Sequence, residues 1–360
     1  MGINMKKTAL IMAGGKGERF WPKSRMNLPK QFLSLTDDGK TMIQLTVERI
    51  SSIVDIKDVY IATNQLYKNL VLEQLQGIPE ENILCEPVGK NTAPCIGLGA
   101  IHAHIHNDDA IMIVLPSDHL IKNQTVFVET LKQACDVAQE GENLVTIGIK
   151  PNYPETGYGY IHYDKQSRLL SANAVKKFVE KPNEELAKQY VESGEYLWNS
   201  GMFVWKVSTI LHNYKELMPD IYKGLCTIQK SIGTNSYTET LNKEFQAFRS
   251  ESVDYGIMEH AKNIYSIPGD FGWDDVGSWL AVGRIKENDI NGNVLNGNIV
   301  AVDTKDCIIE GQDKLIATVG LCDIVIVDTK DALLVCDKKS TGNIKNILSQ
   351  LKDLEKTCYL

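Results

Sequence analysis

The chain has 360 residues with 43% hydrophobic content, which is enough to bury a full core and favours one large domain with one small domain. Its formal net charge of -8 argues against a nucleic-acid binder that works through a broad basic surface. The eight cysteines show no zinc spacing, and the first residues carry too short an apolar run for a signal peptide or a membrane span, so we expect a cytoplasmic protein with reduced thiols.

The first predicted element is a buried strand over the apolar residues 8–13. This strand runs directly into Gly14, Gly15, Lys16 and Gly17, where the glycines allow the backbone to turn sharply. A loop of this kind can present its backbone amides to a phosphate-sized ligand.

Predicted helices and strands alternate along the next part of the chain. We predict strands at 59–63, 111–115 and 145–149, and helices at 43–50, 65–76 and 93–106. This alternation favours a largely parallel sheet covered on both faces, and the ligands of such sheets collect at the carboxyl ends of the strands. Residues 14–17 and Asp118 both follow predicted strands, so both occupy such ends.

The character of the sequence changes in the second half of the chain. Residues 151–289 mix short strands and aromatic residues with a predicted helix near 182–193, as expected for insertions that build a substrate pocket. The following segments are short and β-rich, and they predict a small β-helix-like module that ends in an amphipathic helix at 344–354. We therefore predict two domains, residues 1–288 and residues 289–360.

Positive charge is concentrated in residues 16–30. Against one acidic residue, this segment holds five basic ones: Lys16, Arg19, Lys23, Arg25 and Lys30. Such a concentration suits a compact polyanion such as a triphosphate. Two familiar phosphate motifs fail on spacing, because a dinucleotide fingerprint requires glycine where Phe20 stands and a P-loop requires GK[ST]. A plain glycine turn beside a solvated basic face stays open as the alternative.

Eight motifs follow one another along residues 8–280. The first is GGKGERFWP with LPKQF, which spans residues 14–32. The others are EPVGKNTAP (86–94), LPSDH (115–119), PETGYGYI (154–161), FVEKP (178–182), NSGMF (199–203), SVDYGIME (252–259) and WDDVGSW (273–279). Together they resemble, in order, the motifs of the sugar-1-phosphate nucleotidyltransferases, and in particular the mannose-1-phosphate guanylyltransferases. The resemblance implies an α/β fold with a Rossmann-like catalytic domain on a mixed, mainly parallel sheet, and the β-rich tail resembles the family's C-terminal β-helix module.

The resemblance also implies how the first motif acts. Gly14, Gly15 and Gly17 would wrap the nucleotide phosphates, Arg19 would hold the triphosphate, and Lys30 would reach the reacting phosphate. These roles are chemically reasonable, because phosphoryl-type transfer depends mainly on positioning and on neutralising negative charge. The catalytic residues expected from the sequence are therefore Arg19 and Lys30.

Asp118 and Asp275 resemble the family's pair of metal-binding carboxylates. Magnesium prefers oxygen ligands and commonly uses one or two carboxylates with substrate phosphates and water, so we expect Mg²⁺ as the cofactor. An isolated aspartate more often serves a turn or a cap, which is the alternative for each of them. Asp274 beside Asp275 leaves open which carboxylate points inward, and the family pattern favours Asp275.

Four residues resemble the family's sugar site. Glu180 would accept hydrogen bonds from sugar hydroxyls, Lys181 would meet the sugar phosphate, and Asn199 and Gly201 would contact the ring. A structural ion pair is the alternative for Glu180 and Lys181.

The EPVGKNTAP segment would recognise guanine, with Asn91 and Thr92 as the candidate residues. Lys90 stands where the family more often has arginine. Lysine keeps the charge there but lacks the bidentate fork of arginine.

The sequence therefore predicts an enzyme that transfers GMP from GTP to mannose 1-phosphate. The alternatives are guanylyl transfer to another sugar 1-phosphate, such as a heptose, and a non-catalytic subunit that senses a GDP-sugar. We expect small-molecule substrates, no nucleic-acid or membrane partner, and no phosphomannose isomerase domain, and we also consider a homodimer.

Overall fold

The computed structural model describes residues 5–107 and 109–360. These residues form two compact units. The first unit contains residues 5–14, 46–117 and 121–273, and the second contains residues 15–45, 118–120 and 274–360. Each unit has a hydrophobic core of its own. The domain boundary between residues 288 and 289 stays a prediction from the sequence.

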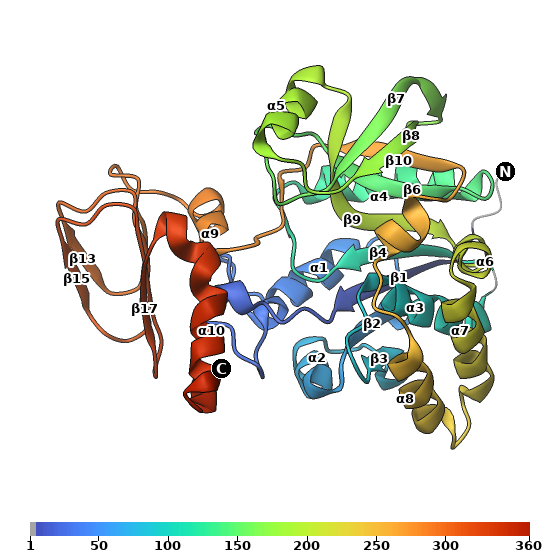
Figure 1. The fold of residues 1–360 in the computed structure, drawn as a ribbon, viewed down its shortest axis with the longest axis horizontal. Coiled ribbons are helices and arrows are strands. Elements are labelled where there is room, and N and C mark those ends of the chain that lie inside the picture. The colour runs from blue at the N-terminus through green and yellow to red at the C-terminus, as the bar shows by residue number, and fades with distance from the viewer. Residues whose placement is uncertain (1–4, 108) are drawn as a thin grey trace. The chain divides into compact units, whose positions relative to one another are not determined.

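A nine-stranded sheet is the framework of the first unit (Figure 1). Its strands are β1 (Lys7–Ala13), β2 (Val59–Asn64), β3 (Ile83–Glu86), β4 (Ile111–Pro116), β6 (Leu144–Ile149), β7 (Tyr160–Leu169), β8 (Ala172–Val179), β9 (Tyr196–Lys206) and β10 (Ile264–Gly269). In space they follow the order β3-β2-β1-β4-β9-β6-β10-β8-β7. Strands β3, β2, β1 and β4 run parallel, as do β6 and β10, whereas β9 is antiparallel to both β4 and β6. The mixed sheet expected from the sequence is thus present.

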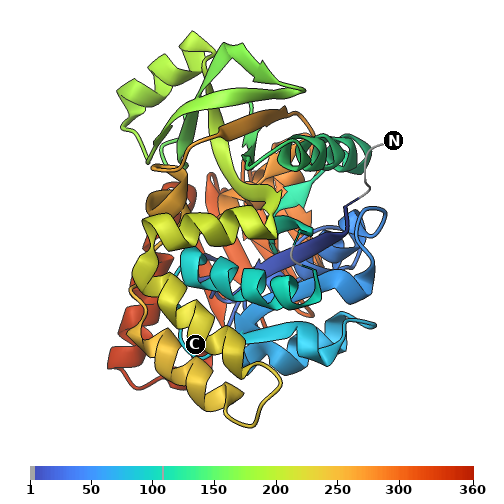
Figure 2. The ribbon, with the colours of Figure 1, turned by 90° about the vertical axis from the view of Figure 1, so that its right-hand side faces the viewer.

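Helices connect and cover these strands. They are α1 (Met42–Ile50), α2 (Lys68–Gln74), α3 (Thr92–His106), α4 (Gln124–Gln139), α5 (Glu184–Ser193), α6 (Val207–Leu217), α7 (Pro219–Ser231) and α8 (Tyr237–Ala247). Helix α3 packs on α6 and α7, and α7 packs on α8, to form one layer (Figure 2). Gly99 allows α3 to approach β1 closely, since a Cβ there would lie 2.6 Å from a methyl carbon of Leu10. This packing fixes the N-terminus of α3 at the carboxyl end of the sheet.

The C-terminal part of the second unit is built from short strands. They are β12 (Val294–Asn296), β13 (Ile299–Val302), β14 (Ile308–Glu310), β15 (Ile316–Val319), β16 (Ile324–Asp328) and β17 (Leu333–Asp337). Strands β12, β14 and β16 stack in parallel, as do β13 and β15, which is the pattern of successive β-helix coils. Strand β17 closes the stack antiparallel to β16, and α10 (Ile344–Asp353) follows it. The predicted β-helix-like module and closing helix are therefore confirmed.

Two tryptophans join the early and late segments of the second unit. Trp279, the first residue of α9 (Trp279–Ile285), is fully buried, and its ring lies 5.2 Å from that of Phe20. Its Nε1 donates to the carbonyl oxygen of Trp21 at 3.1 Å, while Trp21 Nε1 donates to the carbonyl oxygen of Tyr359 at 2.7 Å. Both indole N–H groups are thus satisfied where the rings are buried. The basic segment is held in place by residues far along the chain.

A buried carboxylate adds a second anchor to the same unit. Glu310 at the end of β14 is 1% exposed, and its oxygens lie 2.5 Å from Lys23 Nζ and 3.0 Å from Lys286 Nζ. Burial alone raises the pKa of this carboxyl, but the two ammonium groups outweigh burial and hold the pKa below its ordinary value. Arg25 likewise pairs with Asp331 at 2.6 Å. Lys23 and Arg25 therefore anchor the basic segment on the β-helix region, at the end of β14 and in the turn between β16 and β17.

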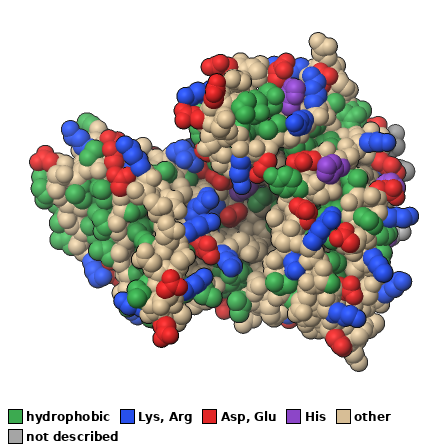
Figure 3. All heavy atoms as spheres, viewed as in Figure 1, with side chains coloured by type: hydrophobic (Ala, Val, Ile, Leu, Met, Phe, Trp, Pro, Cys, Tyr) green, Lys and Arg blue, Asp and Glu red, His purple; other side chains and the backbone are tan. Residues whose placement is uncertain are grey.

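Charges of both signs are interspersed on the molecular face in Figure 3. Within residues 5–107 and 109–360, no helix has the length and apolarity that crossing a membrane requires.

Candidate active site

The glycine loop after β1 is closed by hydrogen bonds inside the second unit. Gln31 Nε2 donates to the Gly15 carbonyl oxygen at 3.0 Å, and Ser24 Oγ donates to the Gly17 carbonyl oxygen at 2.8 Å. Gly17 has a φ of 61°, in the left-handed region, and a Cβ there would lie 2.5 Å from Lys30 Cβ. Glycine at this position therefore lets the loop pack directly against Lys30.

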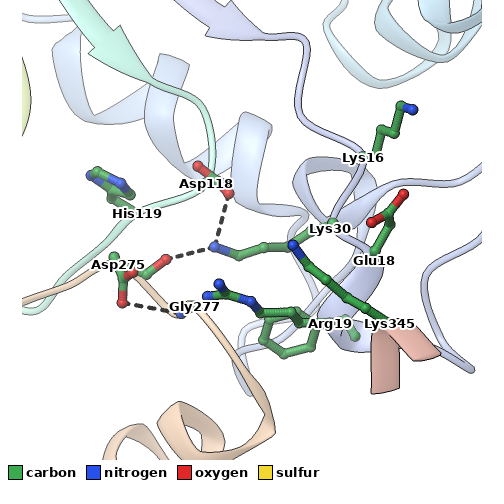
Figure 4. A pocket seen from close by; sticks show the side chains of 11 residues that line it. Lys16, Glu18, Arg19, Lys30, Asp118, His119, Asp275, Gly277 and Lys345 are labelled. Atoms are coloured by element: carbon green, nitrogen blue, oxygen red, sulfur yellow. Dashed lines mark hydrogen bonds and ion pairs between the residues drawn. The ribbon is translucent and has the colours of Figure 1, made fainter. Parts of the chain in front are cut away.

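Lys30 begins a short 3-10 helix and is only 4% exposed. Its Nζ lies 2.8 Å from Asp118 Oδ2 and donates to the Asp275 carbonyl oxygen at 2.6 Å (Figure 4). The same ammonium lies 5.8 Å from the centre of the Phe20 ring. A buried cation needs such partners, because moving a charged group from water into the protein interior without a compensating partner costs free energy.

These side chains surround a cavity of about 330 Å³ within the second unit. Its lining residues are Lys16, Gly17, Glu18, Arg19, Phe20, Lys30, Asp118, His119, Asp275, Gly277 and Lys345. Figure 4 shows the Arg19, Lys30 and Lys345 side chains extending into the space next to the two aspartates. With four basic and three acidic residues around it, the cavity suits phosphate groups and a cation better than an apolar ligand.

The structure distinguishes between the two neighbouring aspartates. Asp274 accepts hydrogen bonds from Arg284 Nε at 2.9 Å and Nη2 at 3.1 Å, so its carboxylate is used inside the fold. Asp275 lines the cavity, and its Oδ1 accepts from the Gly277 backbone N–H at 3.1 Å. The carboxylate that faces the cavity is therefore the one that the family pattern favours.

Asp118 follows β4 and remains ionised despite its surroundings. Burial raises the pKa of its carboxyl, but attraction to Lys30 and His119 and the hydrogen bond from Lys30 bring the pKa below its ordinary value. About a third of the side chain, 32%, is exposed, so a ligand can reach it. Asp118, Asp275, Arg19 and Lys30 thus lie around one space.

The basic segment divides into two groups. Lys16, Arg19 and Lys30 line the cavity, whereas Lys23 and Arg25 form the ion pairs with the β-helix strands. A further cation, Lys345, comes from the first turn of α10. Sequence reasoning missed Lys345, because a lysine on the polar side of an amphipathic helix carries no signal of its own.

The residues expected to contact a sugar lie in the first unit. Glu180 and Lys181 form an ion pair at 3.5 Å with both side chains partly exposed, so this pair contributes little to stability. Asn199 Nδ2 donates to Asp254 Oδ1 at 2.7 Å, and Asn199 Oδ1 accepts from the Gly201 N–H at 3.1 Å. Asp254 was not singled out in the sequence, and it fixes which way the Asn199 amide points.

Glu180 and Asn199 lie next to one another across a glycine. A Cβ on Gly159 would lie 3.1 Å from Glu180 Oε2 and 3.6 Å from Asn199 Cβ. Glu180 also raises the pKa of Asp254, whose main shift comes from burial. The structure therefore brings the predicted sugar residues together, along with one additional carboxyl.

Asn91 and Thr92 begin α3. Asn91 has a φ of 69°, and its Oδ1 accepts from the Thr92 backbone N–H at 2.8 Å as the helix cap. Thr92 Oγ1 accepts from the Val253 N–H at 2.9 Å. Both side chains thus already have partners in the fold.

Gly14 directly follows β1 and is the last residue of the first segment of the first unit. A Cβ on Gly14 would lie 3.3 Å from Glu86 Oε2.

Two family models match the chain. The model described as Nucleotidyl transferase covers residues 8–291, and the model described as MannoseP isomerase/GMP-like beta-helix domain covers residues 297–351. The chain is 41% identical to Mannose-1-phosphate guanylyltransferase 2 of Escherichia coli O157:H7, over 98% of this chain and 75% of that relative.

The chain belongs to the mannose-1-phosphate guanylyltransferase family. It is also 41% identical to Mannose-1-phosphate guanylyltransferase of Salmonella muenchen, over 96% of this chain and 74% of that relative. Among solved structures, mannose-1-phosphate geranyltransferase from Thermus thermophilus is 32% identical, with a TM-score of 0.87 over 97% of this chain and 100% of that one. The family fold and enzyme class expected from the motifs are confirmed.

The contact between Gly17 and Lys30 can be tested with two glycine-to-alanine variants. Gly39 also has a positive φ, of 73°, but a Cβ there meets nothing within 4 Å. We expect Gly39→Ala to lower the free energy of unfolding by about 1 kcal/mol through backbone strain alone. Gly17→Ala should cost about 2–4 kcal/mol, because overpacking against Lys30 adds to the strain. Urea titration measures both values, and equal losses would contradict the contact.

Proposed function

We propose that this protein transfers GMP from GTP to α-D-mannose 1-phosphate and releases GDP-mannose and pyrophosphate. The observation that carries the proposal is the buried Lys30 ammonium, which lies beside Asp118 and Asp275 in a cavity that Arg19 also lines. This arrangement supplies a fixed positive charge next to the carboxylates of Asp118 and Asp275, whose oxygens are suitable metal ligands. The names of the relatives support guanine as the base and mannose as the sugar.

In the proposed reaction, an oxygen of the sugar 1-phosphate attacks the α-phosphorus of GTP. The new oxygen–phosphorus bond forms as the bond from the α-phosphorus to the bridging oxygen breaks, and pyrophosphate leaves with the electron pair. No general base is needed, since a phosphate monoester is already anionic near neutral pH. Lys30 and Arg19 would neutralise the charge that builds up on the phosphates, and Lys16 and Lys345 add positive charge for the leaving pyrophosphate.

The glycine loop would position the triphosphate. We assign the backbone amides around Gly14, Gly15 and Gly17 to the phosphate oxygens, because the N–H groups of a glycine-rich turn can converge on an anion. A Cβ at Gly15 would meet nothing within 4 Å, so the space beside this residue is open. Positioning of this kind is a large share of catalysis in phosphoryl-type transfer.

We propose Asp118 and Asp275 as the magnesium ligands. Both line the same cavity, and Mg²⁺ commonly uses one or two carboxylates with phosphate and water oxygens. Across the part of the chain that the structure describes, no three His, Cys, Asp or Glu side chains cluster as a metal cage, which is compatible with an ion completed by substrate oxygens. When bound, the ion would add positive charge next to the reacting phosphates.

The remaining assignments concern the sugar and the base. We propose that Glu180 and Asn199 accept and donate hydrogen bonds to sugar hydroxyls, that Lys181 meets the sugar phosphate, and that Gly201 allows close approach of the ring. Asp254 would keep the Asn199 amide in one orientation. Asn91 and Thr92 remain assigned to guanine, at the N-terminus of α3.

We propose a homodimer formed through the outer face of β13 and β15. Val302 and Val319 are direct neighbours in these parallel strands and are 48% and 70% exposed, and Val300 on the same face is 52% exposed. A contiguous apolar face on a soluble domain is typical of an interaction surface. We also place the enzyme in the cytoplasm, which agrees with its eight free cysteines.

The reaction is tested by measuring pyrophosphate release with magnesium across GTP, ATP, UTP, CTP and dTTP against mannose, glucose and heptose 1-phosphates. We expect the highest kcat/KM for GTP with mannose 1-phosphate. A different productive pair would keep the transfer chemistry and replace the substrate. Tight GDP-mannose binding without turnover would instead support the sensing subunit.

The metal assignment is tested by Asp118→Asn and Asp275→Asn. Each change keeps the shape of the side chain but removes the negative charge that attracts the ion, so we expect kcat to fall about a hundredfold or more. The exposed Asp270→Asn variant is the control and should keep wild-type turnover. Wild-type activity in both site variants, over a magnesium titration, would refute the assignment.

The dimer is tested by Val302→Lys with the exposed Lys305→Ala as its control. We expect sedimentation equilibrium to give a dimer for the wild type and the control, and a monomer for Val302→Lys, because a charge on an apolar interface must be desolvated. A monomeric wild type would exclude the homodimer.

A further inference from the structure

Strand β3 is the outermost strand of the nine-stranded sheet, and no other strand covers its far edge. Within residues 5–107 and 109–360, β3 pairs with β2 alone and stands at one end of the strand order (Figure 1). Among the same described residues, Leu84 and Cys85 in the middle of β3 have no backbone hydrogen bonds outside the ladder with β2. The backbone groups that point away from β2 therefore remain available to a further strand.

A cavity of about 830 Å³ lies along this free edge, and Ile83, Leu84 and Cys85 of β3 all line it. Successive side chains of a strand point to opposite faces of the sheet, so a cavity that meets three successive residues must follow the edge. The lining residues all belong to the first unit, and none of them lines the proposed phosphate cavity. We call this cavity the β3-edge groove.

The interior of the β3-edge groove is mainly apolar. Tyr60, Leu84 and Leu241 contribute buried side chains to its lining. Helices α2, α3 and α8 supply further lining residues, so the groove has helical walls beside the strand edge. Apolar side chains of a bound segment would leave water on entering the groove, which favours binding.

Several polar side chains in the groove are already paired. The Tyr237 hydroxyl lies 3.0 Å from His102 Nε2, and Lys68 Nζ lies 2.8 Å from Glu80 Oε1. Asn82 Nδ2 donates to two backbone carbonyl oxygens. The regular row of backbone groups along β3 is therefore the main hydrogen-bonding feature that stays open, and it suits a peptide main chain better than a polar small molecule.

Negative charge stands where β3 begins. Glu80 and Glu81 lie shortly before the strand and line the groove. Lys68 neutralises Glu80, whereas Glu81 is exposed and forms no ion pair with any described residue. A basic side chain on the bound segment would therefore gain an electrostatic attraction at this end of the groove.

We propose that the β3-edge groove binds an extended segment of a partner protein, which adds a strand to β3. The main chain of the segment pairs with the free edge, its apolar side chains fill the groove, and a lysine or arginine faces Glu81. In strand addition of this kind the main-chain hydrogen bonds give affinity, and the pockets for alternate side chains give specificity. The proposal does not depend on the substrates of the enzyme, because the groove is separate from the proposed phosphate cavity.

The experiment uses the full chain and a fluorescein-labelled peptide, Lys-Val-Thr-Val-Lys-Val-Thr, which alternates apolar with polar side chains and carries basic residues. We expect the fluorescence anisotropy of the peptide to rise on titration with the protein, with a Kd on the order of 10–100 μM. A peptide with glutamate in place of lysine should bind about tenfold more weakly, because it is repelled by Glu81. A peptide that is N-methylated throughout has no main-chain donors and should not bind.

Variants of the protein locate the binding site. Thr238→Trp places a bulky ring in the groove and should weaken peptide binding about tenfold or more, whereas Glu239→Trp, on the next residue and outside the groove lining, should bind as the wild type does. Glu81→Lys should weaken binding about threefold to tenfold, and Glu73→Lys on the exposed surface of α2 is its control. Equal Tm values would show that all four variants are folded, and equal losses within each pair would contradict the groove.

Hydrogen exchange tests the strand contact itself. The bound peptide should slow the exchange of backbone amides in Ile83–Glu86 of the wild type. Peptide binding without protection of β3 would overturn strand addition, and absence of binding would overturn the groove as a docking site. Protection of β3 that needs no peptide and grows with protein concentration would assign the edge to a second copy of this chain and overturn the partner segment.

Discussion

The proposed phosphate cavity depends on one buried cation, the Lys30 ammonium, whose charge is balanced by its hydrogen-bond partners. Its partners are the Asp118 carboxylate and the Asp275 carbonyl oxygen, so three separate segments of the second unit converge on a single nitrogen atom. Removing a buried charge from one side of such a pair leaves the other side unpaired, which commonly costs about 3–5 kcal/mol. The same ammonium is therefore both a structural centre of the cavity and its most preorganised positive charge.

The basic segment shows how one sequence feature serves two purposes. Lys23 forms an ion pair with Glu310, and Arg25 forms one with Asp331. These contacts hold the basic segment on the β-helix region. Lys16 and Arg19 remain for the cavity. Since α10 also contributes Lys345 to that cavity, the C-terminal region lines the proposed phosphate site as well as supporting the basic segment.

Sequence reasoning worked where the signal was local. The apolar run before Gly14 predicted β1, and the predicted helix at 43–50 corresponds to α1, where the Gln44 side chain accepts from the Thr41 N–H at 2.9 Å. Sequence reasoning failed to identify the helices α6, α7 and α8 in a region expected to hold short strands. The apolar residues of these helices pack into the large core of the first unit, and that packing is not visible in the sequence. Burial of Glu86 and the pairing of Lys23 were beyond its reach, since both depend on partners brought in by tertiary packing.

The discontinuous second unit has a consequence for the order in which the protein folds. Trp21 is synthesised early, but Trp279, whose indole donates to the Trp21 carbonyl oxygen, lies 258 residues later in the chain. Until then the apolar side chains of Phe20 and Trp21 lack the core that buries them in the finished protein. Strands β1 to β4 can pair sooner, so the segment around Phe20 and Trp21 gains the last of its core partners late in synthesis.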